Sequence, residues 1–185
     1  MHAHDSGYIL CPSKVDTKLL SIDLLVAMKL AAHEGEPTTV RQLEDELGLS
    51  KSAAANSLQR LRELDLVKDN ATGGRRVNKL LLRDCLEHAV RWIAPAHVGE
   101  FELGLPTAHA AAAFKQKFTG DDDPVVIPLP HGPLRGRAVT PLHPLAPAAA
   151  ARDPKLHRLL AVVDALRIGR ARDRQLAVAE LRACL

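Results

Sequence analysis

Apolar residues recur at helical spacing in the first part of the chain, and short polar stretches with glycine or proline separate them. The first such segment, Thr17–His33, predicts a helix because its apolar side chains fall about one turn apart. These side chains are Leu20, Leu24, Met28 and Ala31. The Glu-Gly-Glu-Pro stretch at 34–37 ends the helix, since proline cannot continue the hydrogen-bond ladder.

A second and shorter helix is predicted over Val40–Leu47. Either Thr38 or Thr39 is placed to cap its N-terminus, because a threonine hydroxyl can accept a hydrogen bond from a free backbone N–H of the first turn. Gly48 permits the positive φ angle that commonly ends a helix. A tight turn to the next element is therefore expected at this glycine.

A third helix, Lys51–Leu64, is predicted to begin after the capping residue Ser50. Leu66-Val67-Lys68 and Arg75-Arg76-Val77 then indicate two short strands, with a turn at 70–74 that contains two glycines. Three helices that end in a small hairpin are thus expected by residue 77.

The segment after the hairpin predicts one longer helix, which Asn78 caps and which runs to about Ile93, where Pro95 ends it. Beyond Pro95 the pattern is mixed. It indicates a strand near 98–103, a helix over 108–118, little regular structure in the proline-rich span 124–154, and two closing helices at 154–168 and 171–184.

The segments VRQLEDELGLS, KSAAANSLQRL and RELDLV, between Val40 and Val67, resemble the helix-turn-helix of MarR-type and related winged-helix transcriptional regulators. The resemblance covers about residues 17–93. It implies that the helix at 51–64 is the recognition helix and that the hairpin is the wing. We therefore expect a mainly α fold, with a winged helix-turn-helix domain and its short β-hairpin wing, followed by a Pro-rich segment and a C-terminal helical hairpin.

Three regions follow from this interpretation. Residues 1–13 are expected to be a flexible N-terminus, residues 14–95 the winged helix-turn-helix domain, and residues 96–185 a C-terminal region for dimerisation, sensing or partner binding.

The third helix has two opposite faces when its residues are placed at 100° intervals. Ala54, Leu58 and Leu61 form the inward arc, which we expect to pack against the second helix. The outward arc carries hydroxyl and amide side chains that can bond to base edges or phosphates. These side chains are Ser52, Asn56 and Gln59.

Basic residues flank this arc and are expected to contact phosphates, which give affinity and register but little sequence information. The predicted DNA-binding set is Thr39, Arg41, Ser50, Lys51, Ser52, Asn56, Gln59, Arg60, Arg75 and Arg76. An alternative stays open, because polar residues opposite an apolar arc are typical of any surface helix, and helix-turn-helix folds also serve as protein-protein modules.

Homodimerisation is expected, because paired recognition helices on two half-sites give specificity that one helix lacks. Two helices are candidate interfaces, the one at 17–33 and the one at 78–93, whose apolar stripe contains Leu82, Leu86, Val90 and Ile93. The same stripe would also serve to pack the helix on its own domain.

Composition adds little to the DNA argument, because 25 Lys and Arg against 22 acidic residues leave a net charge of only +3. The 46% of hydrophobic residues allows a core, and the 3% of aromatic residues favours helices over a sandwich. Three well-separated cysteines and the lack of a signal-like N-terminus favour the cytoplasm. No apolar run is long enough to predict a membrane-spanning helix.

Catalytic chemistry is not expected. The sequence has no Gly-rich phosphate loop and no nucleophile elbow, and Cys85 with His88 would supply only one side of a metal site. We predict no catalytic residue, no metal and no cofactor.

Two functions for residues 96–185 remain open. In the first, the chain is a repressor whose second half shapes the dimer or senses a small-molecule effector. In the second, it is an antitoxin-type autoregulator whose second half binds and neutralises a partner protein. The Arg-Gly-Arg segment at 135–137 is a secondary candidate for a minor-groove contact. The arginines at 167–174 are a secondary candidate for binding phosphate or an acidic partner surface.

Overall fold

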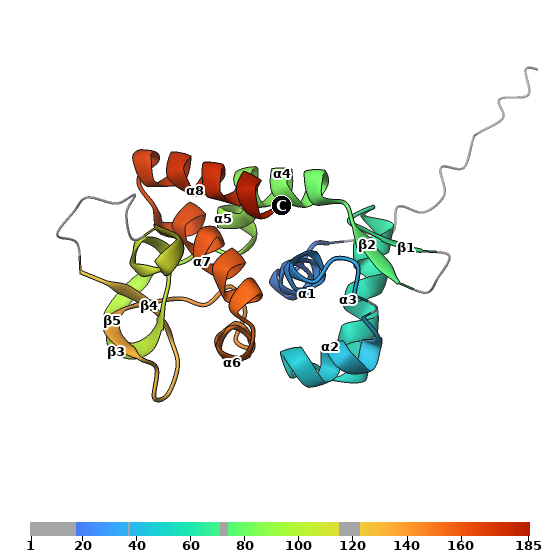
Figure 1. Ribbon diagram of the computed structural model, residues 1–185, viewed down its shortest axis with the longest axis horizontal. Helices are drawn as coiled ribbons and strands as arrows, with labels where there is room; N and C mark the ends of the chain where they lie inside the picture. Colours follow the sequence, from blue (N-terminus) through green and yellow to red (C-terminus); the bar gives the residue numbers. More distant parts are fainter. Residues whose placement is uncertain (1–17, 37, 71–73, 115–122) are drawn as a thin grey trace, which may run out of the picture.

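The computed structural model describes residues 18–36, 38–70, 74–114 and 123–185. The winged helix lies on one side of the molecule and a small β-structure on the other, with helices α1 (Ser21–Ala32) and α7 (Pro154–Ile168) between them (Figure 1). The predicted flexible N-terminus, 1–13, lies outside the described residues. The mainly helical fold class that the sequence predicted is confirmed.

The helix-turn-helix consists of α2 (Val40–Leu47) and α3 (Lys51–Glu63), close to the predicted bounds. Thr39 caps α2 by accepting a hydrogen bond from the Gln42 N–H, and the Gln42 side chain accepts one from the Thr39 N–H. Gly48 ends α2 with a φ of 70°, so the predicted left-handed turn is confirmed.

The wing is an antiparallel hairpin of β1 (Val67–Asp69) and β2 (Arg75–Val77), in which Val67 pairs with Val77. It closes through a hydrogen bond from the Asn70 N–H to the Gly74 carbonyl, and the turn residues 71–73 lie outside the described part. Both strands were predicted. The first begins one residue later than expected.

Helix α1 begins at Ser21, four residues later than predicted, and residue 17 lies outside the described part. Residues 23–31 of this helix are all buried, so it does not have the single apolar stripe that the spacing suggested. The reason is its place in the molecule: α3 packs on one side of α1 and α7 on another (Figure 1).

The helix predicted over 78–93 is divided at Ala89 into α4 (Lys79–His88) and α5 (Val90–Ile93). Asn78 caps α4 as predicted, because its side chain accepts a hydrogen bond from the Leu81 N–H. Ala89 stands between the two helices with a φ of −118°, well away from the value of about −63° typical of an α-helix. One long helix was therefore the wrong prediction.

Three strands form a small closed sheet after α5: β3 (Val98–Pro106), β4 (Val125–Pro128) and β5 (Leu134–Val139). β3 is antiparallel to both of the others, while β4 and β5 run parallel. Gly104 permits this closure, because a Cβ atom there would collide with the Ile127 carbonyl. The strand predicted at 98–103 is confirmed and extends further.

Two predictions for the second half were wrong. Residues 108–114 form two 3-10 turns, Ala108–Ala110 and Ala112–Phe114, rather than a helix over 108–118, whose last four residues lie outside the described part. The span 124–154 contains β4, β5 and α6 (Ala146–Arg152). Three of its prolines fit regular structure because Pro128 is the last residue of β4, and Pro147 and Pro154 lie in the first turns of α6 and α7.

The closing helices α7 and α8 (Ala171–Cys184) have the predicted bounds and pack on each other. The buried apolar side chains of both halves form one continuous cluster. A buried arginine, Arg167, joins the halves: it pairs with Asp164 at 2.6 Å and donates hydrogen bonds to the carbonyls of Ala94 and Pro95.

Candidate nucleic-acid interface

Helix α3 presents a polar face to solvent. Ser52, Asn56 and Gln59 are exposed, while Ala54, Leu58 and Leu61 are at most 1% exposed. The structure therefore brings the three predicted reading residues together on one open side of the helix. Whether they contact DNA stays a prediction.

The hydroxyl groups at the helix starts have structural partners. Ser50 accepts a hydrogen bond from the Ala53 N–H and lies 3.2 Å from the Ser52 hydroxyl, and Thr39 belongs to the capping pair at the start of α2. Arg41 and Lys51 follow these caps and are exposed. The first turns of α2 and α3 thus combine free cationic side chains with the positive ends of two helix dipoles, which favours phosphate binding.

Arg60, which was predicted as a phosphate contact, is engaged within its own domain. Its guanidinium donates two hydrogen bonds to Asp23 of α1, with the Nε and Nη2 atoms at 2.9 and 2.7 Å from the carboxylate oxygens. These bonds raise the pKa of Arg60 and hold α3 on α1. Because the guanidinium is bound inside its own domain, we leave Arg60 out of the proposed DNA contacts.

The two arginines of the wing differ in their surroundings. Arg76 is exposed, and across the hairpin it stands opposite Lys68, also exposed. Both line a hollow of about 470 Å³ at the base of the wing. Lys68 was not in the predicted set, although a basic residue directly opposite another across a predicted hairpin is a signal that the sequence did contain.

Arg75, in contrast, has a side chain that is only 12% exposed. Burial lowers the pKa of Arg75, and its Nε and Nη1 atoms are buried without a hydrogen-bond partner among the described residues. Its nearest carboxylate oxygen, on Asp69, is 3.9 Å away, and Asp69 is itself bound by Arg62 of α3 at 2.6 Å. Arg75 is therefore mainly a part of the packing beneath the wing.

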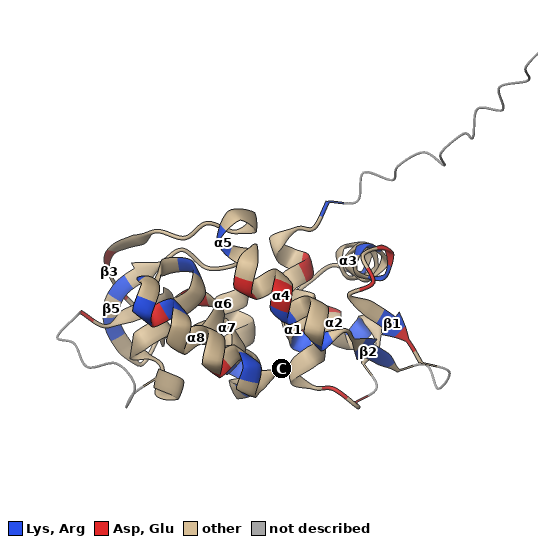
Figure 2. Ribbon diagram, turned by 90° about the horizontal axis from the view of Figure 1, so that it is seen from above, with Lys and Arg blue, Asp and Glu red and all other residues tan. Residues whose placement is uncertain are grey.

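Lysine and arginine side chains are distributed along α3 and both wing strands, with acidic residues among them (Figure 2). The interface is thus mixed in charge and not a continuous basic surface. Sequence-specific contacts from the α3 face would have to supply much of any discrimination between DNA sites.

The leucine stripe predicted as a dimer interface is already buried within the protomer. Leu82 and Leu86 are 0% exposed and Val90 is 1% exposed, while Ile93 is partly buried against the core. α4 and α5 turn this stripe toward α7, so it is not available to a second chain. The apolar side chains exposed on α4 and α5 are Leu80, Leu81 and Trp92.

Two secondary candidates from the sequence are a metal site and the arginine cluster at 167–174. Within the described part of the chain, no group of three or more His, Cys, Asp or Glu side chains is arranged to hold a metal ion. Of the arginine cluster at 167–174, Arg167 is buried and Arg174 donates to the Gly169 carbonyl, while Arg170 and Arg172 are exposed.

None of the helices in the described ranges has the length and apolar character needed to cross a membrane.

Residues 19–76 match the model of the MarR family. The matched segment starts just before α1 and ends within β2, so it contains the helix-turn-helix and nearly all of the wing. No curated protein and no solved structure matches the chain. The resemblance predicted from the α2–α3 sequence is therefore confirmed for the winged helix, and residues 77–185 lie outside the match.

Proposed function

We propose that this chain is a DNA-binding transcriptional regulator whose helix α3 enters the major groove, since residues 19–76 match the model of the MarR family. The observation that carries the proposal is the exposed face of α3. Asn56 and Gln59 present amide groups of the kind that pair with adenine edges, while Leu58 and Leu61 fix the helix on its core.

Phosphate contacts in this proposal come from exposed cations around α3. They are Arg41, Lys51, Lys68 and Arg76. They would set the register of the protein on DNA and give the binding its dependence on salt.

We propose further that the regulator acts as a homodimer in the cytoplasm and as a repressor. A single recognition helix reads only a few base pairs, so two copies on adjacent half-sites are needed for a specific operator. The exposed Leu81 and Trp92 on α4 and α5 support association beside the winged helix, since such side chains gain free energy when a second chain covers them. Repression would follow from occupation of the promoter.

One feature favours the antitoxin-type alternative. Phe101 and Leu103 of β3 are 45% and 50% exposed, and they stand opposite the exposed Arg137 and Arg135 of β5. This face would suit an acidic and apolar partner protein. Co-expression with the product of the adjacent gene tests it: stable co-purification that is lost in Phe101→Ala would favour the alternative.

The proposed function is tested by titrating labelled DNA from the region upstream of the chain's own gene, with random DNA of equal length as the control. We expect tighter binding to the upstream DNA, with a linear decrease of log affinity as log salt rises. Equal and weak binding to both DNAs, or none, would contradict the proposal.

A further inference from the structure

The C-terminal region makes a polar contact with the helix-turn-helix at the α6–α7 corner, which we define as Arg152 and Asp153. The Arg152 guanidinium donates hydrogen bonds to the backbone carbonyls of Asp45 and Glu46, at 3.4 and 3.1 Å. These carbonyls belong to the last turn of α2, where a helix has no acceptor partners of its own. A cation is also favoured there by the helix dipole.

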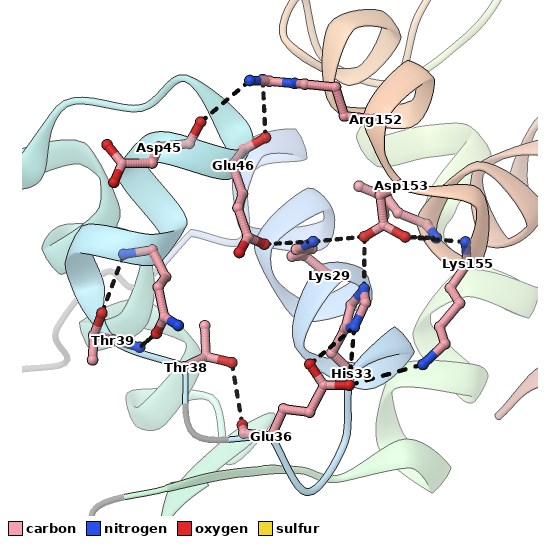
Figure 3. A network of polar contacts seen from close by, with 12 residues as sticks. Lys29, His33, Glu36, Thr38, Thr39, Asp45, Glu46, Arg152, Asp153 and Lys155 are labelled. Atoms are coloured by element: carbon pink, nitrogen blue, oxygen red, sulfur yellow. Dashed lines mark hydrogen bonds and ion pairs between the residues drawn. The ribbon is translucent and has the colours of Figure 1, made fainter.

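The carboxylate of the neighbouring Asp153 is within hydrogen-bond distance of four nitrogen atoms (Figure 3). Its carboxylate accepts from Lys29 Nζ of α1 at 2.6 Å and lies 2.7 Å from Nε2 of His33, the residue that follows α1. It also accepts from the N–H groups of Lys155 and Leu156, and so caps α7. One carboxylate therefore fixes the start of α7 to the end of α1.

Lys29 extends the same network to α2. Its side chain is only 8% exposed, and its ammonium lies 2.6 Å from carboxylate oxygens of both Asp153 and Glu46. Burial alone would lower the pKa of Lys29, but the hydrogen bonds to Asp153 and Glu46 raise it above its ordinary value. The cation is therefore held charged between α2 and the corner.

These polar contacts matter because few side chains of α2 are buried. It buries only Leu43 and Leu47, and a hollow of about 670 Å³, lined in part by Gln42, Asp45 and Ala149, lies between α2 and the corner. α2 packs on α3 and on α6, and its C-terminal end is held by Arg152 and, through Lys29, by Asp153.

We infer that Arg152 and Asp153 are positioning residues for DNA binding. They hold α2, and with it the turn and the start of α3, from outside the segment that matches the MarR family. The inference rests on the proposed function for its consequence, since α2 carries Arg41 and its capped N-terminus toward the proposed DNA surface. On this view the C-terminal region completes the winged helix as a DNA-binding unit.

The test compares Arg152→Ala with Arg172→Ala in the full-length chain. Arg172 is an exposed arginine of α8 and serves as the matched control. We expect Arg152→Ala to weaken binding to the upstream DNA by about fivefold or more, a typical size for coupling between separate parts of a protein. The salt slope should not change, because no phosphate contact is lost. Arg172→Ala should leave the affinity unchanged.

Two further variants separate positioning from general damage. Arg152→Lys keeps a cation at the end of α2 and should restore part of the affinity. Asp153→Asn keeps an oxygen for the α7 cap but removes the charge that faces Lys29, and should weaken binding in the same way as Arg152→Ala. Amide hydrogen exchange then reports on α2 directly, with faster exchange at Leu47, Gly48 and Leu49 expected in Arg152→Ala.

Unchanged affinity and unchanged exchange in Arg152→Ala would overturn the inference. A salt slope reduced by about one unit would also overturn it, because Arg152 would then be a phosphate contact itself. If the wild-type chain binds no DNA, the proposed function fails. The hydrogen exchange of α2 would still decide whether the corner holds this helix.

Discussion

The Arg60 guanidinium faces the Asp23 carboxylate in a two-pronged pair, with N–O distances of 2.9 and 2.7 Å. Asp23 is 0% exposed and also accepts a hydrogen bond from the Leu20 N–H at the start of α1. The pair therefore ties α3, the proposed reading helix, to the largely buried helix α1. An arginine on the flank of α3 thus contributes to the orientation of that helix, because its guanidinium is engaged within the winged domain.

Replacing Arg60 by alanine should lower the free energy of unfolding by about 3 kcal/mol, because it leaves a fully buried carboxylate without its counter-ion. Urea unfolding followed by circular dichroism measures this loss. The control is Arg62→Ala, which breaks the exposed pair with Asp69 and should cost less than about 1 kcal/mol. Equal losses in the two variants would contradict the assigned role of Arg60.

The sequence was sufficient for the helix-turn-helix because its signals are local. Thr39 and Ser50 cap helices that begin at the next residue, and Gly48 ends α2 through its own backbone angle. The inward arc of α3 follows from helical spacing alone. These features depend on neighbours within a few residues, which a sequence pattern records.

The contacts that depend on distant segments were not predictable in the same way. Asp23 and Arg60 are 37 residues apart, and Lys29 and Asp153 are 124 residues apart. The apolar stripe of α4 had two possible uses, and only the position of α7 decides that Leu82 and Leu86 pack internally. Closure of the β3–β5 sheet likewise depends on the pairing of strands across a proline-rich span.

Asn56 and Gln59 should carry much of the discrimination between DNA sequences. The double variant Asn56→Ala with Gln59→Ala removes two amides from the exposed face while alanine preserves the helix. We expect binding to the upstream DNA to fall to the level of random DNA, with the salt slope unchanged. Competition titrations measure the ratio of the affinities for upstream and random DNA. Repeating them at several salt concentrations gives the salt slope.

The matched control for this variant is Gln175→Ala, which removes an exposed amide from α8. It should retain the full preference for upstream DNA. In the free protein Gln59 donates a hydrogen bond to Glu63 at 3.0 Å, so contact with a base requires this bond to be exchanged. Retained discrimination in the double variant would mean that α3 is not the reading helix.

The two wing arginines should behave differently when each is replaced. Arg76→Ala removes an exposed cation and should weaken binding to all DNA similarly, with the salt slope reduced by about one unit. Arg75→Met keeps an apolar stem of similar size and removes buried nitrogen atoms that have no hydrogen-bond partner among the described residues. It should raise the free energy of unfolding by about 1 kcal/mol and leave the salt slope unchanged.

Salt-dependent titrations and urea unfolding of both variants decide which of the two arginines contacts phosphate and which one packs beneath the wing. The opposite assignment, with the salt slope reduced by Arg75→Met and not by Arg76→Ala, would show that the wing rearranges when DNA binds.

Stability at low pH should depend on Asp153. Burial alone would raise the pKa of this carboxyl, but hydrogen bonds from Lys29, the Leu156 N–H and His33 lower it from 3.8 to about 2. A lowered pKa means that the folded state favours the charged form. The stabilisation is therefore complete above the unfolded-state pKa and is lost as the pH falls from about 4 through about 2.

The size of this effect is about 2 kcal/mol, from the free energy that corresponds to each pKa unit. Asp153→Asn is the comparison, because asparagine keeps an acceptor for the α7 cap but cannot be charged. Urea unfolding at a series of pH values should find the wild type more stable by about 2 kcal/mol above about pH 4, with most of that difference gone by about pH 2. A difference that stays constant to the lowest pH would show that Asp153 acts through its shape and cap alone, and that its charge does not hold α1 against α7.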